Sequence, residues 1–338
     1  MTALPEPDFD ALGADDALPH NAVALGWLPI REVARRTGVN PVTLRAWERR
    51  YGLVVPHRTP KGHRLYSPEH LERIHRVLTW LNRGVSVSQI KALLDTPEQR
   101  LAAPTPSDWV PLRENLVHAI GELAERRLDE LFNQAMALYP STTLCERLML
   151  PLLSDLHQRW QQQYGAQLEQ AFFHGWLRSK LGTRLYHNNR QLSGPPLLLI
   201  KHSDVPFDPE LWLTAWLASS ADCPVEVLDW PLPAGEVALA ADRLAARALV
   251  LYSARPLQLD NLARVLASCP CPVMLAGPAV VIHGQALKER GDLRGLLQAS
   301  DPLAAHLTLR QHSLFWDLHE PFLPAPAGLA AYRSASGR

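Results

Sequence analysis

The stretch NPVTLRAWERRYG, at residues 40–52, constrains the fold of this chain more than any other, because its start and both of its faces are defined. Asn40 is a residue type that caps helix N-termini through its side-chain oxygen. Pro41 suits the first helical position, where a missing N–H leaves no hydrogen bond unmade. The sequence therefore predicts a short helix that begins at Pro41.

This predicted helix has one apolar face and one basic face. At about 100° per residue, Leu44, Trp47 and Tyr51 fall on the same side, which is the spacing of a stripe that packs on a core. Arg45 and Arg49 project from the opposite side. Most basic faces are only solvated, so the role of this one depends on its neighbours.

The elements on either side suggest that role. Upstream, LPIREVARRTGV predicts a helix that ends at Gly38, a residue type that terminates helices. Two short helices joined by such a turn form a helix-turn-helix, whose second helix enters the major groove of DNA. Downstream, LVVPHRTPKGHRLYSPEH predicts a hairpin with residues 54–55 and 64–66 as strands and residues 60–62 as its tip. Ser67 is expected to cap the helix that follows.

The charge distribution also favours a nucleic-acid partner. Residues 28–95 hold 13 Lys or Arg and 5 Asp or Glu, a net charge of +8. The whole chain holds 34 of each kind and is neutral. A basic segment within a neutral chain is typical of a DNA-binding head attached to a body with another role.

Three motifs carry a resemblance to a known family. IREVARRTGVNPVTLRAWERRYGL, GHRLYSPEHLERI and LNRGVSVSQIKALLD occur in this order within residues 30–95. Together they resemble the winged-helix DNA-binding domain of the MerR-type transcription regulators. The form AWERRYG at residues 46–52 is similar to the branch that holds cobalamin-dependent photoreceptor repressors and regulators of curli and biofilm genes. We therefore expect a winged helix-turn-helix head at residues 27–97, in a sequence-specific DNA-binding regulator rather than an enzyme.

The resemblance also implies how such a head binds. Its expected partner is double-stranded DNA carrying a near-palindromic operator, bound by a homodimer or a tetramer, with RNA polymerase as a candidate second partner. The contacts to bases and phosphates are expected from the second helix and the hairpin. The residues implied are Thr43, Arg45, Arg49, Arg50, Arg58, Lys61, His63, Arg64 and Tyr66.

After a Pro-rich break, residues 105–192 predict a four-helix bundle. Apolar residues recur every three or four positions, as in LCERLMLPLLSDLHQRW. Pro151 is expected to kink the third helix. Breaks are expected near Arg127, at residues 139–140 and at Gly165. The predicted helices span residues 108–126, 128–138, 142–163 and 166–190.

The hydrophobic period changes again in residues 195–315. Four short and continuously apolar runs, PLLLIKHS, VEVLDW, ALVLYSA and PVMLAGP, predict strands. Helical stretches at residues 208–220, 235–246 and 257–268 lie between them. Strands that alternate with helices indicate a parallel, flavodoxin-like (Rossmann-type) α/β domain that is covered on both faces. Such folds bind ligands at the carboxyl ends of their strands. The chain as a whole is thus expected to be a multidomain α and α/β protein.

A winged head, a helix bundle and an α/β domain, in that order, resemble the cobalamin photoreceptor repressors. The resemblance implies cobalamin-contacting motifs from which this chain departs. The positions that correspond to those motifs are Trp160, Gln170, Ala171, Glu210, Leu213, Ser253 and Gly277. A carboxylate replaces a cobalt-binding imidazole poorly, and a leucine fills space that a close approach needs. We therefore expect a body that has lost cobalamin.

Two alternatives stay open for the body. In the first, the chain is a cobalamin-dependent, light-sensing repressor with unusual ligands, and His174 is then a candidate. In the second, the body binds a partner protein or is a vestigial cobalamin carrier. Cys269 and Cys271 cannot by themselves supply a closed metal site, and no metal is expected.

The remaining features concern the termini and the compartment. Residues 1–26 are acidic and lack an apolar run, so they are expected to form a disordered tail, and residues 316–338 a second tail. Four cysteines without a spaced framework indicate a reducing cytoplasm. No run of apolar residues is long enough for a membrane helix.

Overall fold

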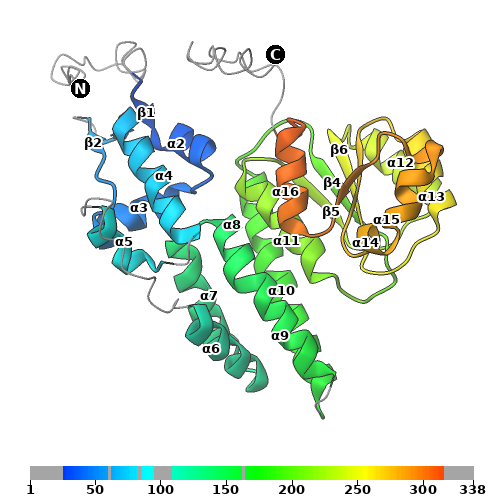
Figure 1. Cartoon of the computed structure of the whole chain (residues 1–338), viewed down its shortest axis with the longest axis horizontal. Helices are drawn as coiled ribbons and strands as arrows, with labels where there is room; N and C mark the ends of the chain where they lie inside the picture. Colours follow the sequence, from blue (N-terminus) through cyan, green and yellow to red (C-terminus); the bar gives the residue numbers. More distant parts are fainter. Residues whose placement is uncertain (1–25, 60–61, 83–84, 95–108, 162–163, 316–338) are drawn as a thin grey trace, which may run out of the picture.

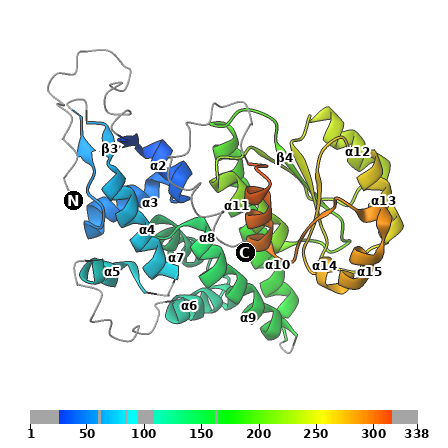
Figure 2. The ribbon, with the colours of Figure 1, turned by 45° about the horizontal axis from the view of Figure 1, so that its top comes forward.

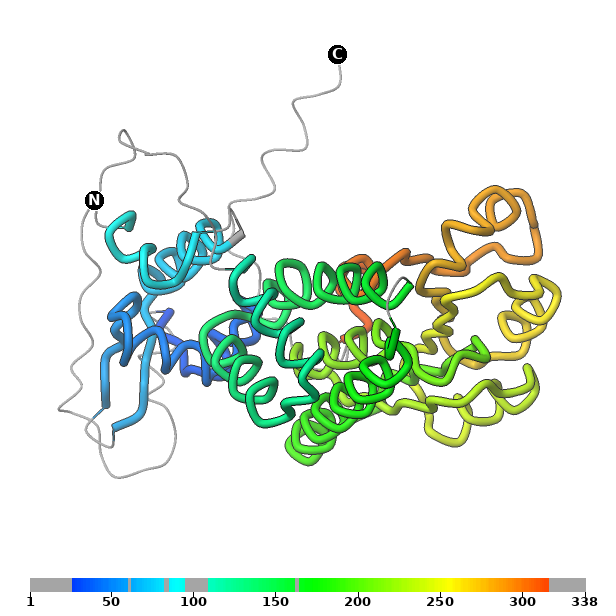
Figure 3. The backbone as a smooth tube through the Cα atoms, turned by 90° about the horizontal axis from the view of Figure 1, so that it is seen from below, coloured from blue at the N-terminus to red at the C-terminus, as the bar shows by residue number. Residues whose placement is uncertain are grey.

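The structure is a computed structural model that describes residues 26–59, 62–82, 85–94, 109–161 and 164–315. Three regions follow one another along the longest axis (Figure 1). We name them the head (residues 26–94), the helical region (109–189) and the α/β region (197–315). Figure 3 shows the same order from below, with the hairpin of the head at the end away from the α/β region. Within the described ranges, no helix has both the length and the apolar character that a membrane span requires.

The head combines short helices with a three-stranded antiparallel sheet. Strand β3 is central and pairs with β1 on one side and β2 on the other. The elements are β1 (Leu28–Pro29), α2 (Ile30–Thr37), α3 (Pro41–Ala46), a wider π-helical turn (Trp47–Tyr51), β2 (His57–Arg58), β3 (Arg64–Tyr66), α4 (Pro68–Asn82) and α5 (Val87–Leu94).

The helix-turn-helix forms for the local reasons that the sequence predicts. Helix α2 ends at Gly38, whose φ of 72° is left-handed. The side chain of Asn40 then accepts a hydrogen bond from the backbone N–H of Thr43 at 2.9 Å, and Pro41 opens α3. The Ser67 hydroxyl accepts a hydrogen bond from the N–H of His70 at 3.4 Å in the first turn of α4.

The first strand of the predicted hairpin was misplaced. Residues 54–55 are not a strand; β2 begins two residues later, at His57, while β3 occupies residues 64–66 as predicted. The reason is packing, because Val54 and Pro56 are buried in the head whereas Val55 points to solvent. Pro56 also has no N–H to donate to a neighbouring strand, so pairing with β3 begins only after it, at His57.

The helical region contains long helices that pack on one another. Helix α6 contacts α7, α9 and α10, and α10 contacts α9. The elements are α6 (Trp109–Gly121), α7 (Glu125–Leu138), α8 (Ser141–Leu144), a π-helical turn (Cys145–Met149), α9 (Leu150–Trp160) and α10 (Ala166–Asn189).

Two predicted boundaries in this region need correction. The break between the first two helices lies at residues 122–124, where Leu123 adopts a φ of 54°, and Arg127 lies inside α7. The disturbance expected at Pro151 appears one turn earlier, as the π-helical turn. A proline ring clashes with the carbonyl four residues before it, and the wider turn makes room for that carbonyl. The break at Gly165 is confirmed, with a φ of 82°.

The α/β region is a parallel five-stranded sheet in the order β5-β4-β6-β7-β8. This is the flavodoxin-like order, with its switch point between β4 and β6. The four predicted strands are confirmed, and β8 is an additional strand. The elements are β4 (Leu197–Lys201), α11 (Pro209–Ser220), β5 (Val225–Leu228), α12 (Ala234–Arg243), β6 (Ala248–Tyr252), α13 (Leu259–Ser268), β7 (Val273–Ala276), α14 (Ala279–Ile282), α15 (Gly284–Glu289), a 3-10 turn (Gly291–Leu293), β8 (Leu297–Ala299) and α16 (Pro302–Gln311).

Successive side chains along each strand point to opposite faces of the sheet and pack in two separate hydrophobic cores. One face of the sheet carries Leu199 and Val250 and packs against α11 and α16. The other face carries Ile200 and Leu251 and packs against α12 and α13. Figure 2 shows these two helix layers on opposite sides of the sheet. Both faces are therefore covered, as the continuously apolar strands predict.

The three regions share contacts. The indole Nε1–H of Trp47 in the head donates a hydrogen bond to the carbonyl oxygen of Leu138, at the end of α7, at 2.8 Å. Helices α10 and α11 pack along one another and join the helical region to the sheet. The head also approaches the α/β region near Asp222, in the loop after α11. Burial raises the pKa of the Asp222 carboxyl, and the positive charges of Arg35 and Arg31 in α2 oppose that rise.

We expect Trp47 to be the main anchor of the head. It is fully buried, so Trp47→Ala should lower the free energy of unfolding by about 3–5 kcal/mol, as other large-to-small core changes do. Trp47→Phe keeps a ring but leaves the Leu138 carbonyl unpaired, which should cost about 1–3 kcal/mol. Urea unfolding followed by circular dichroism measures both losses.

The matched control is Trp230→Ala, because this tryptophan is 72 % exposed. It should change stability by less than about 0.5 kcal/mol. Equal unfolding midpoints for Trp47→Ala and Trp230→Ala would contradict the anchoring role.

Candidate nucleic-acid interface

Helix α3 and the π-helical turn that continues it present one open face to solvent. Val42, Arg45 and Arg49 are exposed on this face, and their spacing of three and four residues aligns them along the helix. Leu44 and Trp47 lie on the opposite face and are fully buried. The amphipathic division predicted from the sequence is therefore present, and no part of the chain that the structure describes covers the basic face.

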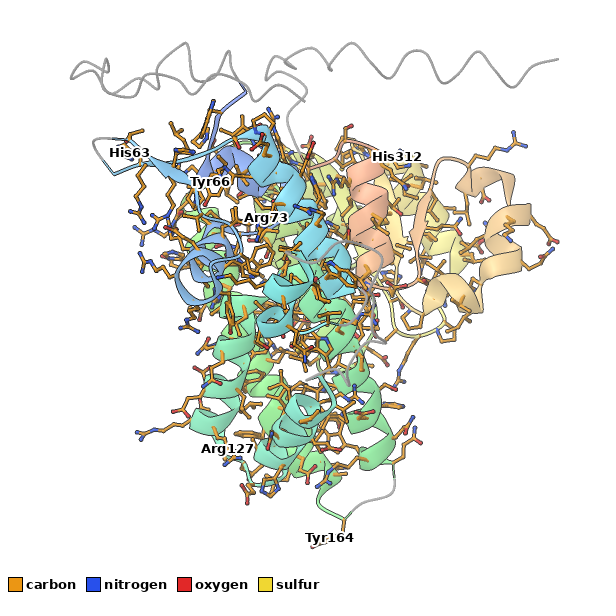
Figure 4. All side chains as sticks on the ribbon, turned by 60° about the vertical axis from the view of Figure 1, so that its left-hand side comes forward. His63, Tyr66, Arg73, Arg127, Tyr164 and His312 are labelled. Carbon is orange, nitrogen blue, oxygen red and sulfur yellow. The ribbon has the colours of Figure 1, made fainter. Side chains whose placement is uncertain are left out.

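The structure brings most of the predicted DNA-contacting residues to the surface of the head. Lys61 lies outside the described residues. Figure 4 shows His63 near the outer end of the hairpin, with Arg73 on helix α4 behind it. Arg64 is partly buried. The exposed residues of the predicted set are Arg45, Arg49, Arg50, Arg58 and His63.

Thr43 and Tyr66 are corrections to that set, because both are buried. Thr43 lies on the edge of a helix that packs against α7, and its side chain is fully enclosed. Tyr66 is enclosed within the head, and burial raises the pKa of its phenol to about 12. A side chain that is closed off in this way is not available to a DNA strand.

Glu48 holds the hairpin against α3, and its role was not predicted from the sequence. Its two carboxylate oxygens form ion pairs with Arg58 at 2.8 Å and with Arg64 at 2.6 Å. Burial opposes ionisation of Glu48, but the two guanidinium groups outweigh it and lower the pKa of the carboxyl. A single acid among five arginines of the helix and the hairpin is the signal that could have identified it.

The sheet carries a second cluster of polar side chains at the carboxyl ends of β4 and β6. The Tyr252 hydroxyl donates a hydrogen bond to the Glu210 carboxylate at 2.5 Å, and Ser203 donates one to Asp208. Burial raises the pKa values of both carboxyl groups. These side chains satisfy one another at the switch point, where α/β sheets bind ligands.

The positions that correspond to a cobalamin site are filled by the chain itself. Glu210 is engaged by Tyr252, and Leu213 is fully buried in the hydrophobic core. Gly277 has a φ of 94°, and a Cβ there would lie 2.8 Å from the Tyr252 ring and from the Ser253 carbonyl. The ring thus occupies the space beside the glycine.

The corresponding positions in the helical region also differ from a cobalamin cap. Gln170 and Ala171 are exposed on the outside of α10. Trp160 instead donates a hydrogen bond at 3.2 Å to Glu169, which also pairs with Arg159. These residues form a structural network that ties α9 to α10.

His174 lies on α10, close to these residues. Its ring lies 4.9 Å from that of Phe207, centroid to centroid, and also contacts Trp160. Burial lowers the pKa of His174 to about 4. With Glu210 paired to Tyr252, Leu213 buried in the core and the Tyr252 ring beside Gly277, the positions of the motif as packed here do not fit cobalamin.

The described residues do not form a metal site built on cysteine. The sulfur atoms of Cys269 and Cys271 lie 3.6 Å apart, at the approach to β7. No group of three or more His, Cys, Asp or Glu side chains within the described part of the chain is placed to hold a metal ion. Two thiols alone do not close a metal site.

A basic helix-turn-helix joined to a separate body defines the class of DNA-binding transcription regulators. Residues 28–96 match the family described as MerR HTH family regulatory protein. The chain is 34 % identical over 201 residues to the HTH-type transcriptional regulator MlrA of Salmonella typhimurium (strain SL1344), covering 59 % of this chain and 78 % of that protein. The chain belongs to the MerR family, and it is a DNA-binding transcription regulator.

Two further comparisons concern a second regulator and a solved structure. The HTH-type transcriptional repressor CarH of Myxococcus xanthus is 28 % identical over 144 residues, covering 39 % of this chain and 47 % of that protein. A crystal structure of a cobalamin-binding protein from Desulfitobacterium hafniense DCB-2 is similar at a TM-score of 0.33 and 13 % identity, over 61 % of this chain and 92 % of that one. The relatives named here are regulators, not enzymes.

We expect Glu48→Gln to destabilise the head in a pH-dependent way. Because the folded-state pKa of Glu48 is lowered, its contribution is present above the ordinary value of 4.5 and is lost as the pH falls through the folded-state value. At pH 7 the loss should be about 1–3 kcal/mol, and it should shrink toward pH 3.

Melting curves of the variant and the parent at several pH values test this. Glu32→Gln is the matched control, because its ion pairs with Arg35 and Arg36 are exposed and should contribute less than about 1 kcal/mol. A gap between parent and Glu48→Gln that is constant from pH 7 to pH 3 would rule out the ionised role.

We expect the purified chain to stay colourless after incubation with adenosylcobalamin in the dark. The reason is that Glu210, Leu213 and Tyr252 occupy the ligand and close-approach positions. Calorimetric titration with the cofactor measures the affinity. Binding at micromolar concentration or tighter would overturn this view of the body.

Proposed function

We propose that this chain recognises a near-palindromic DNA operator by placing the exposed face of α3 in the major groove. The observation that carries the proposal is the arrangement of Arg45 and Arg49 on an open helix face whose other side is anchored by Trp47. Helices of this kind contact base edges with their N-terminal residues. Arg45 lies nearer the helix start and reads a base, while Arg49 and Arg50 contact bases or phosphates.

The hairpin acts as a wing beside this helix. Arg58, His63 and Arg64 contact the flanking phosphates and the minor groove, and Lys61 is included on its sequence position. Glu48 supports the wing because it pairs with Arg58 and Arg64 and fixes their distance from α3. Since Arg58 remains half-exposed, it can bind a phosphate while the pair persists.

The remainder of the chain is a sensory or oligomerisation body without cobalamin. Helices α6, α7, α9 and α10 are the four helices of the bundle predicted for residues 105–192, of which the structure describes 109–161 and 164–192, and the flavodoxin-like domain spans residues 195–315. The mutual contacts of these helices and the filled switch point of the sheet support this assignment. The regulator acts on chromosomal DNA in the cytoplasm, together with RNA polymerase, and its branch implies targets of the biofilm and curli type.

We expect Arg45→Ala to weaken operator binding by about 1–3 kcal/mol and binding to random DNA much less, because a lost base contact removes discrimination. Fluorescence anisotropy at two salt concentrations, on DNA selected from a random library by the full chain, gives both affinities. Arg76→Ala, an exposed arginine of α4, is the control and should leave both unchanged. Operator binding by Arg45→Ala as tight as that of the parent would mean that the face is only solvated.

We also expect two heads to occupy each operator. A near-palindromic site read by a two-fold dimer has half-sites one helical turn or a multiple apart. Sedimentation of the chain with selected DNA gives the stoichiometry, which should be two or four chains for each duplex. One chain for each duplex at saturation would contradict the dimer.

A further inference from the structure

We infer that Val42 recognises the 5-methyl group of a thymine in each operator half-site and so sets part of the sequence preference. The inference rests on the proposed function, because it needs α3 to lie in the major groove. It adds a specificity residue that is neither charged nor polar, beside the arginines of the same face.

The exposure of Val42 is the first observation. The side chain is 57 % exposed, whereas Leu44 and Trp47 on the same helix are fully buried. Val42 is not among the buried residues of the core that these two residues help to build. In the proposed complex this exposed apolar side chain lies on the helix face that meets DNA, where it is available for an apolar contact.

The position of Val42 is the second observation. It is the second residue of α3, directly after the Asn40 cap and Pro41, so its place is fixed by the hydrogen bond from Thr43 to Asn40. The first turn of a recognition helix is the part that meets base edges. Arg45 follows one turn later on the same face, and Arg49 follows Arg45 by a further turn.

The chemistry of valine selects the target. Its side chain has no hydrogen-bond donor or acceptor, so it cannot satisfy the amino, carbonyl or N7 groups of the base edges. In the major groove the thymine methyl is the apolar feature that distinguishes one base pair from another. The branched side chain also has few rotamers and loses little freedom on contact. Arg45 beside it suits a guanine, so the expected half-site places a thymine close to a guanine.

Replacement of thymine by deoxyuridine tests the inference, because it removes the methyl group and keeps base pairing. The probes are duplexes that the full chain selects from a random library, with each thymine replaced singly. One position in each half-site should weaken parent binding about four-fold on replacement, the equivalent of one buried hydrocarbon group. Val42→Ala should bind the thymine and deoxyuridine duplexes equally.

Val55→Ala is the matched control, since Val55 is 62 % exposed but lies outside α3. It should keep the four-fold preference. Val42→Ala with an unchanged preference, or parent binding that no replacement weakens, would overturn the role of Val42 while leaving DNA binding intact. A library from which the full chain selects no sequence would overturn the proposed function itself, and the inference with it.

Discussion

The burial of Trp47 is the constraint on which the rest of the molecule depends. Its indole fills the core of the head, and its N–H bonds to the Leu138 carbonyl at the end of α7. One side chain thus fixes the rotation of α3 about its axis and joins that helix to the body. Because Trp47 points inward, Arg45 and Arg49 must point outward. The exposed face is a consequence of the packed one.

This connection also gives the body a physical route to the head. The end of α7 contacts α3, and the loop at Asp222 lies close to Arg31 and Arg35 of α2. Any ligand or partner that moves α7 relative to the sheet would change the support of the recognition helix. At the switch point, Tyr252 and Glu210 close the site with the chain's own groups.

The sequence predicted the parts of the fold that depend on local chemistry. The Asn40 cap, the Gly38 helix end and the four short apolar strand runs all depend on a few neighbouring residues, and each was found where expected. Strand β8 was not predicted, because its three residues, LQA, form no continuous apolar run. The break at residues 122–124 was also missed, although Gly121 ends α6, because the left-handed residue itself is Leu123 and not a glycine.

The candidate site was predictable in outline but not in detail. Helical spacing alone placed Arg45 and Arg49 on an open face. The burial of Thr43 depends on the docking of α7, and the pairing of Glu48 depends on the path of the hairpin, so neither follows from local sequence. Tyr66 was expected to contact DNA with the other hairpin residues, yet its side chain is buried in the head.

Methylation interference on the selected operator tests the central claim most directly. Dimethyl sulfate modifies guanine N7, which lies in the major groove, where a recognition helix must pass. The account predicts that methylation at guanines in two major-groove segments, about one helical turn or a multiple apart, weakens binding of the full chain, and that Arg45→Ala loses this sensitivity at one guanine in each half-site. Binding of the full chain that is indifferent to methylation at every guanine would contradict the placement of α3 in the groove.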